Sequence, residues 1–186
     1  MSYLKCEICG MEINENNYNF NEHAFSNKNY IDNIIYCPFC GASKKYLNEE
    51  NNIIEVDSNL LDEDTLKILD HAVKLEIFNG DFYNTAANMA KSTEVSNLFK
   101  SLAKVEIFHS KVHSRLGGFD KTPVLNKISY ARYNSDNSLL ELAKQKEEHA
   151  VAYYNKYKNE VKDKNIIRVF EALSEVEKEH IILVRN

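Results

Sequence analysis

The sequence predicts a mainly α-helical fold, in which a small N-terminal β-rich module precedes a four-helix bundle. Two observations lead to this prediction. An internal repeat spans the C-terminal two thirds of the chain, and all four cysteines lie near the N-terminus. A repeated helical hairpin supplies four helices, whereas paired cysteines are typical of a small metal-stabilised unit.

The repeat appears when the sequence is shifted by 71 residues, the distance from Glu76 to Glu147. The polar pairs that this shift aligns are Glu76 with Glu147, Tyr83 with Tyr154, Glu106 with Glu177, and His109 with His180. Identical apolar pairs include Leu69 with Leu140, Ala72 with Ala143, Phe99 with Phe170, and Leu102 with Leu173. We therefore expect two related helical hairpins with a pseudo-two-fold relation.

Four segments repeat apolar residues at alternating steps of three and four, which predicts four amphipathic helices. The segments are 66–90, 95–116, 140–161 and 166–184, within a domain of residues 60–186. Their expected N-terminal caps are Asp62 or Asp64, then Ser92, then Ser138 in a capping box with Glu141, then Asp163. Residues 117–137 form a long crossover between parallel second and third helices, which is typical of a ferritin-like bundle.

The apolar stripes carry polar residues with metal-binding chemistry. These inward-facing residues are Glu76, Glu106, His109, Glu147, Glu177 and His180. Four buried carboxylates cost several kcal/mol per ion unless opposite charge lies among them, and no Lys or Arg occupies the stripes. Two divalent cations would balance the four glutamates, with the two imidazoles completing the coordination. The alternative is that the glutamates are protonated, or neutralised by a side chain from another helix.

Composition and charge narrow the function classes. The chain has 186 residues, is 44% hydrophobic, and contains no apolar run near the roughly 20 residues that a membrane span needs. A secretory leader is not evident, so we expect a cytoplasmic protein with reduced cysteines and no membrane association. A net charge of -5 and a pI near 5.7 give no basic field for nucleic acid.

Residues 1–55 predict a separate four-cysteine module. Two motifs, Cys6-Glu-Ile-Cys9-Gly and Cys37-Pro-Phe-Cys40-Gly, each end in a glycine that permits a tight turn. Paired motifs of this kind form a tetrahedral four-thiolate metal site, and the metal stabilises a core too small to fold alone. The ligand chemistry suits iron or zinc equally.

With these motifs in place, the chain resembles the rubrerythrins. In domain order it resembles the reverse rubrerythrins, which carry a rubredoxin-like module ahead of a ferritin-like di-iron bundle. The spacing between Cys9 and Cys37 and the Cys-Pro-x-Cys-Gly motif are similar to those of rubredoxins. The chain lacks Trp, and its spacer lacks the usual Pro and Gly turns, so a zinc ribbon stays open as an alternative. The resemblance favours iron at this site.

The resemblance also implies roles for the bundle residues. Glu106 and Glu177 would bridge two irons, Glu76 and Glu147 would be terminal ligands, and His109 and His180 would each add one nitrogen. Manganese fits the same ligands. Tyr83 and Tyr154 would hydrogen-bond to ligand carboxylates, with ordinary core packing as the alternative. His113 lies on the inward stripe and reads as a core histidine.

One family feature is missing. Rubrerythrins have a further Glu three residues after the third-helix ligand, where this chain has Ala150. The remaining set of four Glu and two His is similar to that of bacterioferritins. This difference keeps iron oxidation, storage or delivery, with a structural zinc ribbon, as an alternative function.

The function that the resemblance implies is reduction of hydrogen peroxide, or of O2, to water in oxidative-stress defence. Electrons would come from a rubredoxin or an NAD(P)H-dependent flavoprotein and pass through the four-cysteine iron. A homodimer would place one chain's module near the other chain's bundle, on the expectation that a module lies too far from its own bundle. A non-catalytic zinc-stapled interaction module is a third reading.

Overall fold

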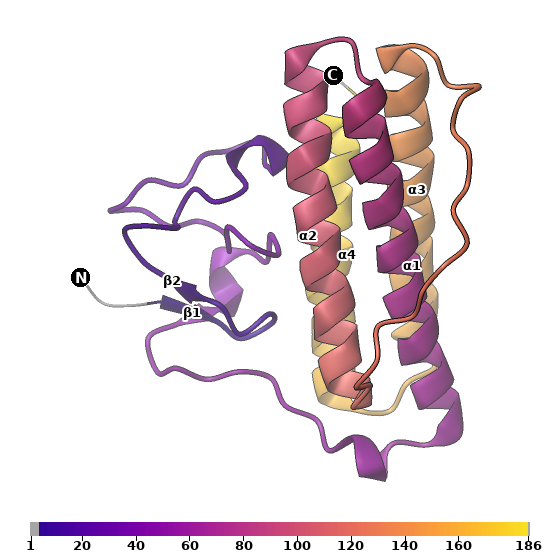
Figure 1. Cartoon of the computed structure of the whole chain (residues 1–186). Coiled ribbons are helices and arrows are strands. Elements are labelled where there is room, and N and C mark those ends of the chain that lie inside the picture. The colour runs from indigo at the N-terminus through magenta and orange to yellow at the C-terminus, as the bar shows by residue number, and fades with distance from the viewer. Residues whose placement is uncertain (1–3, 186) are drawn as a thin grey trace.

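The computed structural model describes residues 4–185 and confirms a mainly helical protein with a small N-terminal strand region (Figure 1). The four bundle helices are α1 (Glu63–Met89), α2 (Thr93–Gly117), α3 (Asp136–Tyr157) and α4 (Lys164–Leu183). Each hairpin is antiparallel, and α2 and α3 run in the same direction, as the long crossover predicted. Within residues 4–185, none of these helices combines the length and apolarity needed to span a membrane.

Three of the four predicted caps are present. The side chains of Asp62, Ser92 and Asp163 each accept a hydrogen bond from a backbone N–H in the first turn of α1, α2 and α4. These bonds satisfy donors that have no partner inside the helix, each worth about 1 kcal/mol. The repeat mates Ser92 and Asp163 therefore start equivalent helices.

The predicted capping box of Ser138 with Glu141 is wrong. The N-cap of α3 is Ser135, whose hydroxyl accepts from the Ser138 N–H at 3.2 Å. The helix begins earlier because Asp136 accepts from the backbone N–H groups of Lys91 and Ser92, at 2.8 and 2.9 Å. This contact fixes the first turn of α3 to the loop between α1 and α2.

The crossover, residues 118–135, contains no helix and runs along the outside of the bundle (Figure 1). Tyr130 anchors it, since this side chain is 8% exposed and its ring centroid lies 5.1 Å from that of Phe82. The crossover therefore returns the chain to the top of the bundle without adding a fifth helix.

The N-terminal module is built around a small antiparallel sheet of β1 (Leu4–Cys6), β2 (Glu12–Ile13) and β3 (Leu47–Asn48), in the order β2-β1-β3. Three short 3-10 helices, η1 (Glu22–Ala24), η2 (Lys44–Tyr46) and η3 (Ser58–Leu60), complete the segment before α1. Gly10 and Gly41 end the two cysteine turns with φ of 78° and 80°. Glycine adopts this left-handed conformation without the steric penalty of other residues.

The module packs against α2 and α4 of its own chain (Figure 1). Gly41 lies so close to α4 that a Cβ there would approach Val176 Cγ1 to 2.6 Å. The rings of Phe39 and Phe108 meet with centroids 5.3 Å apart. Surface ion pairs add to this interface, Lys45 with Glu175 and Arg168 with Glu7. The second cysteine turn therefore packs tightly against the bundle.

Candidate metal centres

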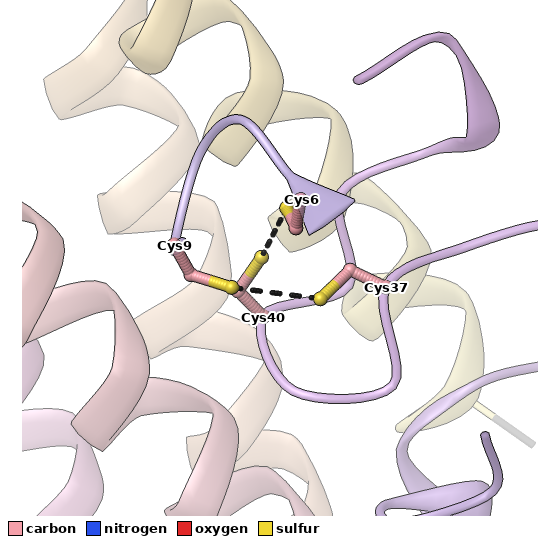
Figure 2. Close-up of side chains that lie close together, drawn as sticks. All are labelled: Cys6, Cys9, Cys37 and Cys40. Atoms are coloured by element: carbon pink, nitrogen blue, oxygen red, sulfur yellow. Dashed lines mark hydrogen bonds between the residues drawn. The ribbon is translucent and has the colours of Figure 1, made fainter. Parts of the chain in front are cut away.

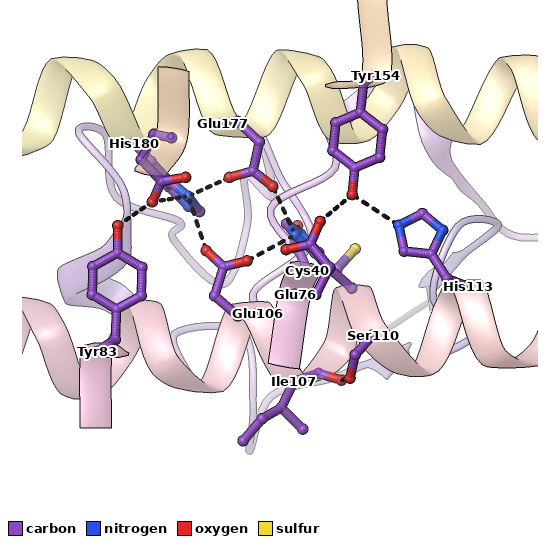
Figure 3. Close-up of polar contacts among 12 residues, drawn as sticks. Cys40, Glu76, Tyr83, Glu106, Ile107, Ser110, His113, Tyr154, Glu177 and His180 are labelled. Carbon is purple, nitrogen blue, oxygen red and sulfur yellow. Dashed lines mark hydrogen bonds and ion pairs between the residues drawn. The ribbon is translucent and has the colours of Figure 1, made fainter. Parts of the chain in front are cut away.

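All six predicted bundle ligands lie close together inside the bundle, and each is 0% exposed. Figure 3 labels Glu76, Glu106, Glu177 and His180 among them. α1 supplies Glu76, α2 supplies Glu106 and His109, α3 supplies Glu147, and α4 supplies Glu177 and His180. The Glu and His of α2 and α4 are three residues apart, so each pair lies on one helix face. The stripes thus project six ligands from four helices to one point.

The six residues form two overlapping groups. Ligand atoms of Glu76, Glu106, His109 and Glu177 lie within 4.8 Å of one another, and so do those of Glu106, Glu147, Glu177 and His180. Only Glu106 and Glu177 belong to both groups. Two metal positions that share two carboxylates are the arrangement expected of a dinuclear site in such a bundle.

Both histidines direct Nδ1 toward the carboxylates. His109 Nδ1 lies 2.9 Å from Glu177 Oε1, and His180 Nδ1 lies 3.0 Å from Glu177 Oε2. On its other side, His109 Nε2 lies 2.8 Å from the backbone carbonyl oxygen of Cys40. If Nε2–H donates to this carbonyl, the lone pair of Nδ1 is free to bind a metal. His180 Nε2 has no such partner among residues 4–185.

Two tyrosines form hydrogen bonds from one helical hairpin to the other. Tyr83 on α1 donates to Glu147 on α3, and Tyr154 on α3 donates to Glu76 on α1 (Figure 3). Both phenols are 0% exposed, and burial first, then the adjacent carboxylates, raises their pKa well above the usual value. They therefore stay protonated and serve as donors, beyond ordinary core packing.

His113 breaks the symmetry of this arrangement. It is a buried core histidine as expected, and its Nε2 lies 2.8 Å from the Tyr154 hydroxyl. Burial lowers the pKa of His113 to about 3, so the ring is neutral. Because Tyr154 donates to Glu76, the His113 Nε2–H donates to the phenol oxygen. The counterpart of His113 in the repeat is Val184, so no histidine in the part of the chain that the structure describes takes the equivalent place beside Tyr83.

Without a bound metal, the buried carboxylates of this cluster are unfavourable in their charged form. Burial, then repulsion from neighbouring carboxylates, raises the pKa of Glu76 and Glu106 well above the usual range, and raises that of Glu147 to about 7. Burial also acts to raise the pKa of Glu177, but the two imidazoles outweigh it and hold that pKa low. For His180 the carboxylates overcome burial and raise the pKa to about 10. Protons therefore occupy the cluster at neutral pH.

The donor set fits two divalent cations. Six buried ligand atoms of the cluster, including both oxygens of Glu106, have no hydrogen-bond partner among the described residues. Buried polar atoms of this kind normally have partners. Two cations would satisfy them and balance the four carboxylates.

A lysine side chain does not neutralise the buried carboxylates in place of metal ions. Lys146 lies beside the α3 stripe, so the stripe pattern did not indicate its burial, yet it is 8% exposed. Its Nζ lies 3.7 Å from the ring centroid of Phe78, and in residues 4–185 it forms no ion pair. Burial lowers the pKa of Lys146 to about 8, against the attraction of Glu147 and Glu106. The ammonium therefore adds a nearby positive charge without bonding to a ligand.

The four cysteines form a second compact group (Figure 2). Their sulfur atoms all lie within 4.8 Å of one another, with Cys6 to Cys40 at 3.7 Å and Cys9 to Cys37 at 3.5 Å. A tetrahedral metal with bonds of about 2.3 Å has sulfur–sulfur edges of about 3.8 Å. Cys9 alone is partly exposed. The geometry fits one four-thiolate metal.

Metal binding to the bundle should release protons and strengthen with pH. The raised pKa values of Glu76, Glu106 and His180 mean that protons must leave before these groups bind a cation. We expect the affinity for Mn²⁺ to increase between pH 6 and pH 8. Calorimetric titration in buffers of different ionisation enthalpy would count the released protons. A heat independent of buffer would contradict this expectation.

Replacing His113 should affect one metal position more than the other. We expect His113→Val to weaken the position held by Glu76 and His109 by about tenfold, because outer-shell partners typically contribute 10- to 100-fold. Stepwise titration with Mn²⁺ would measure both positions. The control is Ser110→Ala, on the same helix, whose hydroxyl donates to the Ile107 carbonyl at 2.9 Å and to no ligand among the described residues. Equal weakening of both steps would refute the asymmetry.

The fold and this site define a class of proteins, four-helix bundles with a buried carboxylate–histidine site able to hold two metal ions. The family model described as ferritin-like domain matches residues 64–186, more than half of the chain. The chain therefore belongs to the ferritin-like domain family. Neither the curated proteins nor the solved structures gave a match.

Proposed function

We propose that this protein is a rubrerythrin-like oxidoreductase that reduces hydrogen peroxide to water, with O2 as a second oxidant. The observation that carries the proposal is the 2.8 Å contact between the Cys40 carbonyl and the ring of His109. It brings a four-thiolate centre to within one hydrogen bond of a ligand of the dinuclear site. An iron-storage protein with a purely structural zinc ribbon has no need for this contact.

The reaction converts one peroxide, two electrons and two protons into two water molecules. Two ferrous ions in the bundle would supply both electrons and act as Lewis acids toward the peroxide oxygens. Glu106 and Glu177 would bridge the ions, and Glu76 and Glu147 would be terminal ligands. All six ligand side chains are fully buried, which excludes bulk water and favours a small oxidant over a bulky organic substrate.

The tyrosines hold protons beside the ligands. Tyr83 and Tyr154 each keep a hydroxyl proton on a bond to a terminal glutamate. His113 holds a further proton on Nε2, in contact with Tyr154. These groups orient Glu76 and Glu147 and place exchangeable protons within hydrogen-bond reach of the site, as general acid chemistry requires.

Electrons would reach the module at its exposed side. Cys9 is the partly exposed cysteine, so a rubredoxin or an NAD(P)H-dependent flavoprotein would donate there, and Cys40 faces the bundle. The expectation that a module lies too far from its own bundle is wrong, because Cys40 contacts His109 of the same chain. A homodimer is still predicted, but distance between module and bundle is no longer a reason for it. Solution scattering would test this prediction.

One observation favours iron oxidation and storage or delivery as the second candidate. Ala150 is 0% exposed and faces the core where rubrerythrins have a further Glu. The chain therefore lacks a ligand that would let an iron change its coordination with redox state. Zinc at the four cysteines would accompany this function.

Two measurements on the purified protein separate the candidates. Ferric iron bound by four thiolates is red, whereas zinc is colourless, so visible absorption and metal analysis identify the module's metal. Peroxide consumption is then followed with NADPH, a flavoprotein reductase and rubredoxin as the electron source. We expect turnover without accumulation of ferric mineral. A colourless protein that oxidises and retains many ferrous ions per chain, but does not consume peroxide, would refute the proposal.

A further inference from the structure

Arg115 links the bundle to the first cysteine turn. It lies on α2, and its Nη2 donates to the carbonyl of Ile8 at 2.5 Å and to that of Ile54 at 3.4 Å. Ile8 lies inside the Cys6–Cys9 turn. A Cβ on Gly10 would lie 3.7 Å from Arg115 Nη1, so the guanidinium packs directly against this turn.

The charge of Arg115 has no carboxylate partner within ion-pair distance among residues 4–185. Arginine stays protonated in proteins, so a positive charge remains beside the module. Burial lowers the pKa of Arg115, and the sulfur groups of Cys9, Cys6 and Cys40 are the main influences that oppose this shift. The guanidinium therefore lies within electrostatic reach of the cysteine sulfur atoms.

We propose that Arg115 raises the reduction potential of iron at the four-cysteine centre, as a positioning residue that does not bind the metal. The inference rests on the proposed function because it requires iron at this centre. Ferric iron with four thiolates carries a net charge of -1, and uptake of one electron from the donor, without a proton, makes it -2. A fixed positive charge stabilises the more negative reduced form.

The position of Arg115 on α2 gives this effect a consequence. The same helix carries Glu106 and His109, so the guanidinium lies beside the first cysteine turn only when the module is seated on the bundle. A seated module is therefore easier to reduce than a detached one. Electrons would be held preferentially at centres that are in contact with His109.

The test is a mediated redox titration of the full-length, iron-reconstituted protein, followed through the ferric thiolate absorption. Arg115→Gln keeps a donor for the Ile8 carbonyl but removes the charge. We expect it to disfavour reduction by about tenfold, which is about 59 mV lower for a one-electron couple. Arg115→Lys keeps the charge and should stay close to the parent potential.

Arg168→Gln is the matched control, because Arg168 joins α4 to the module through Glu7 at the surface. We expect a clearly smaller fall in its potential, because the Arg168 side chain is half exposed and water screens its charge. An unchanged potential for Arg115→Gln, or an equal shift for Arg168→Gln, would overturn the proposal. If Arg115→Gln fails to bind iron, the reduction potentials of Arg115→Lys and Arg168→Lys are compared instead. A much lower potential for Arg115→Lys, which keeps the positive charge, would refute the electrostatic role.

Failure of the proposed function is distinguishable from failure of this inference. Zinc in the isolated protein would argue against electron transfer through the module. The potentials of the iron-reconstituted variants would still report whether Arg115 acts on the thiolate centre.

Discussion

Replacing Glu106 and Glu177 together by Ala should abolish peroxide turnover and remove both metals from the bundle. These two carboxylates are the only members that the two ligand groups share, so their loss leaves each position with one Glu and one His. Two protein ligands do not hold a divalent ion against water at ordinary metal concentrations. We expect activity at the uncatalysed background and two fewer metals per chain, measured by metal analysis and peroxide consumption.

The red absorption of iron at the four cysteines should survive this change, since that site lies in a separate module. Glu94→Ala with Glu179→Ala is the matched control, because both carboxylates lie exposed on the same two helices. The control should keep its metals and its activity. If the variant lacking Glu106 and Glu177 still bound two metals in the bundle and reduced peroxide at the parent rate, the protein would not be a di-iron enzyme.

The helices and the grouping of the six candidate ligands were predictable from the sequence because both depend on periodic patterns. A 71-residue repeat aligns Glu76 with Glu147, and the apolar stripes place both on buried faces. Local chemistry also identified Asp62, Ser92 and Asp163 as caps. These features depend on spacing along one helix, which a single sequence records directly.

Contacts between distant segments were not predictable in this way. The Cys40 carbonyl that meets His109 is a backbone group, so no residue type marks it. The cap of α3 was misplaced because Asp136 bonds to the loop before α2, a tertiary contact that extends the helix. The position of His113 on the inward stripe indicated a buried side chain. Because His113 has no counterpart in the repeat, the sequence did not indicate that Tyr154 is its partner.

Cys37→Ser with Cys40→Ser should stop donor-driven turnover while leaving the bundle site intact. Both thiols are fully buried, and burial raises the pKa of each well above its usual value, so a bound cation is needed to hold them as thiolates. A core as small as this module depends on its metal for folding. We expect loss of the red absorption and a fall of NADPH-driven peroxide reduction to background.

A single turnover separates loss of electron transfer from loss of the active site. When the bundle iron of this variant is reduced chemically with dithionite and the excess removed, one equivalent of peroxide should still reoxidise it, because all six bundle ligands are present. Ser26→Ala, an exposed change in the same module, is the control and should retain full donor-driven turnover. Unchanged NADPH-driven activity in the double cysteine variant would show that electrons bypass the module, and the contact between Cys40 and His109 would then have only a structural role.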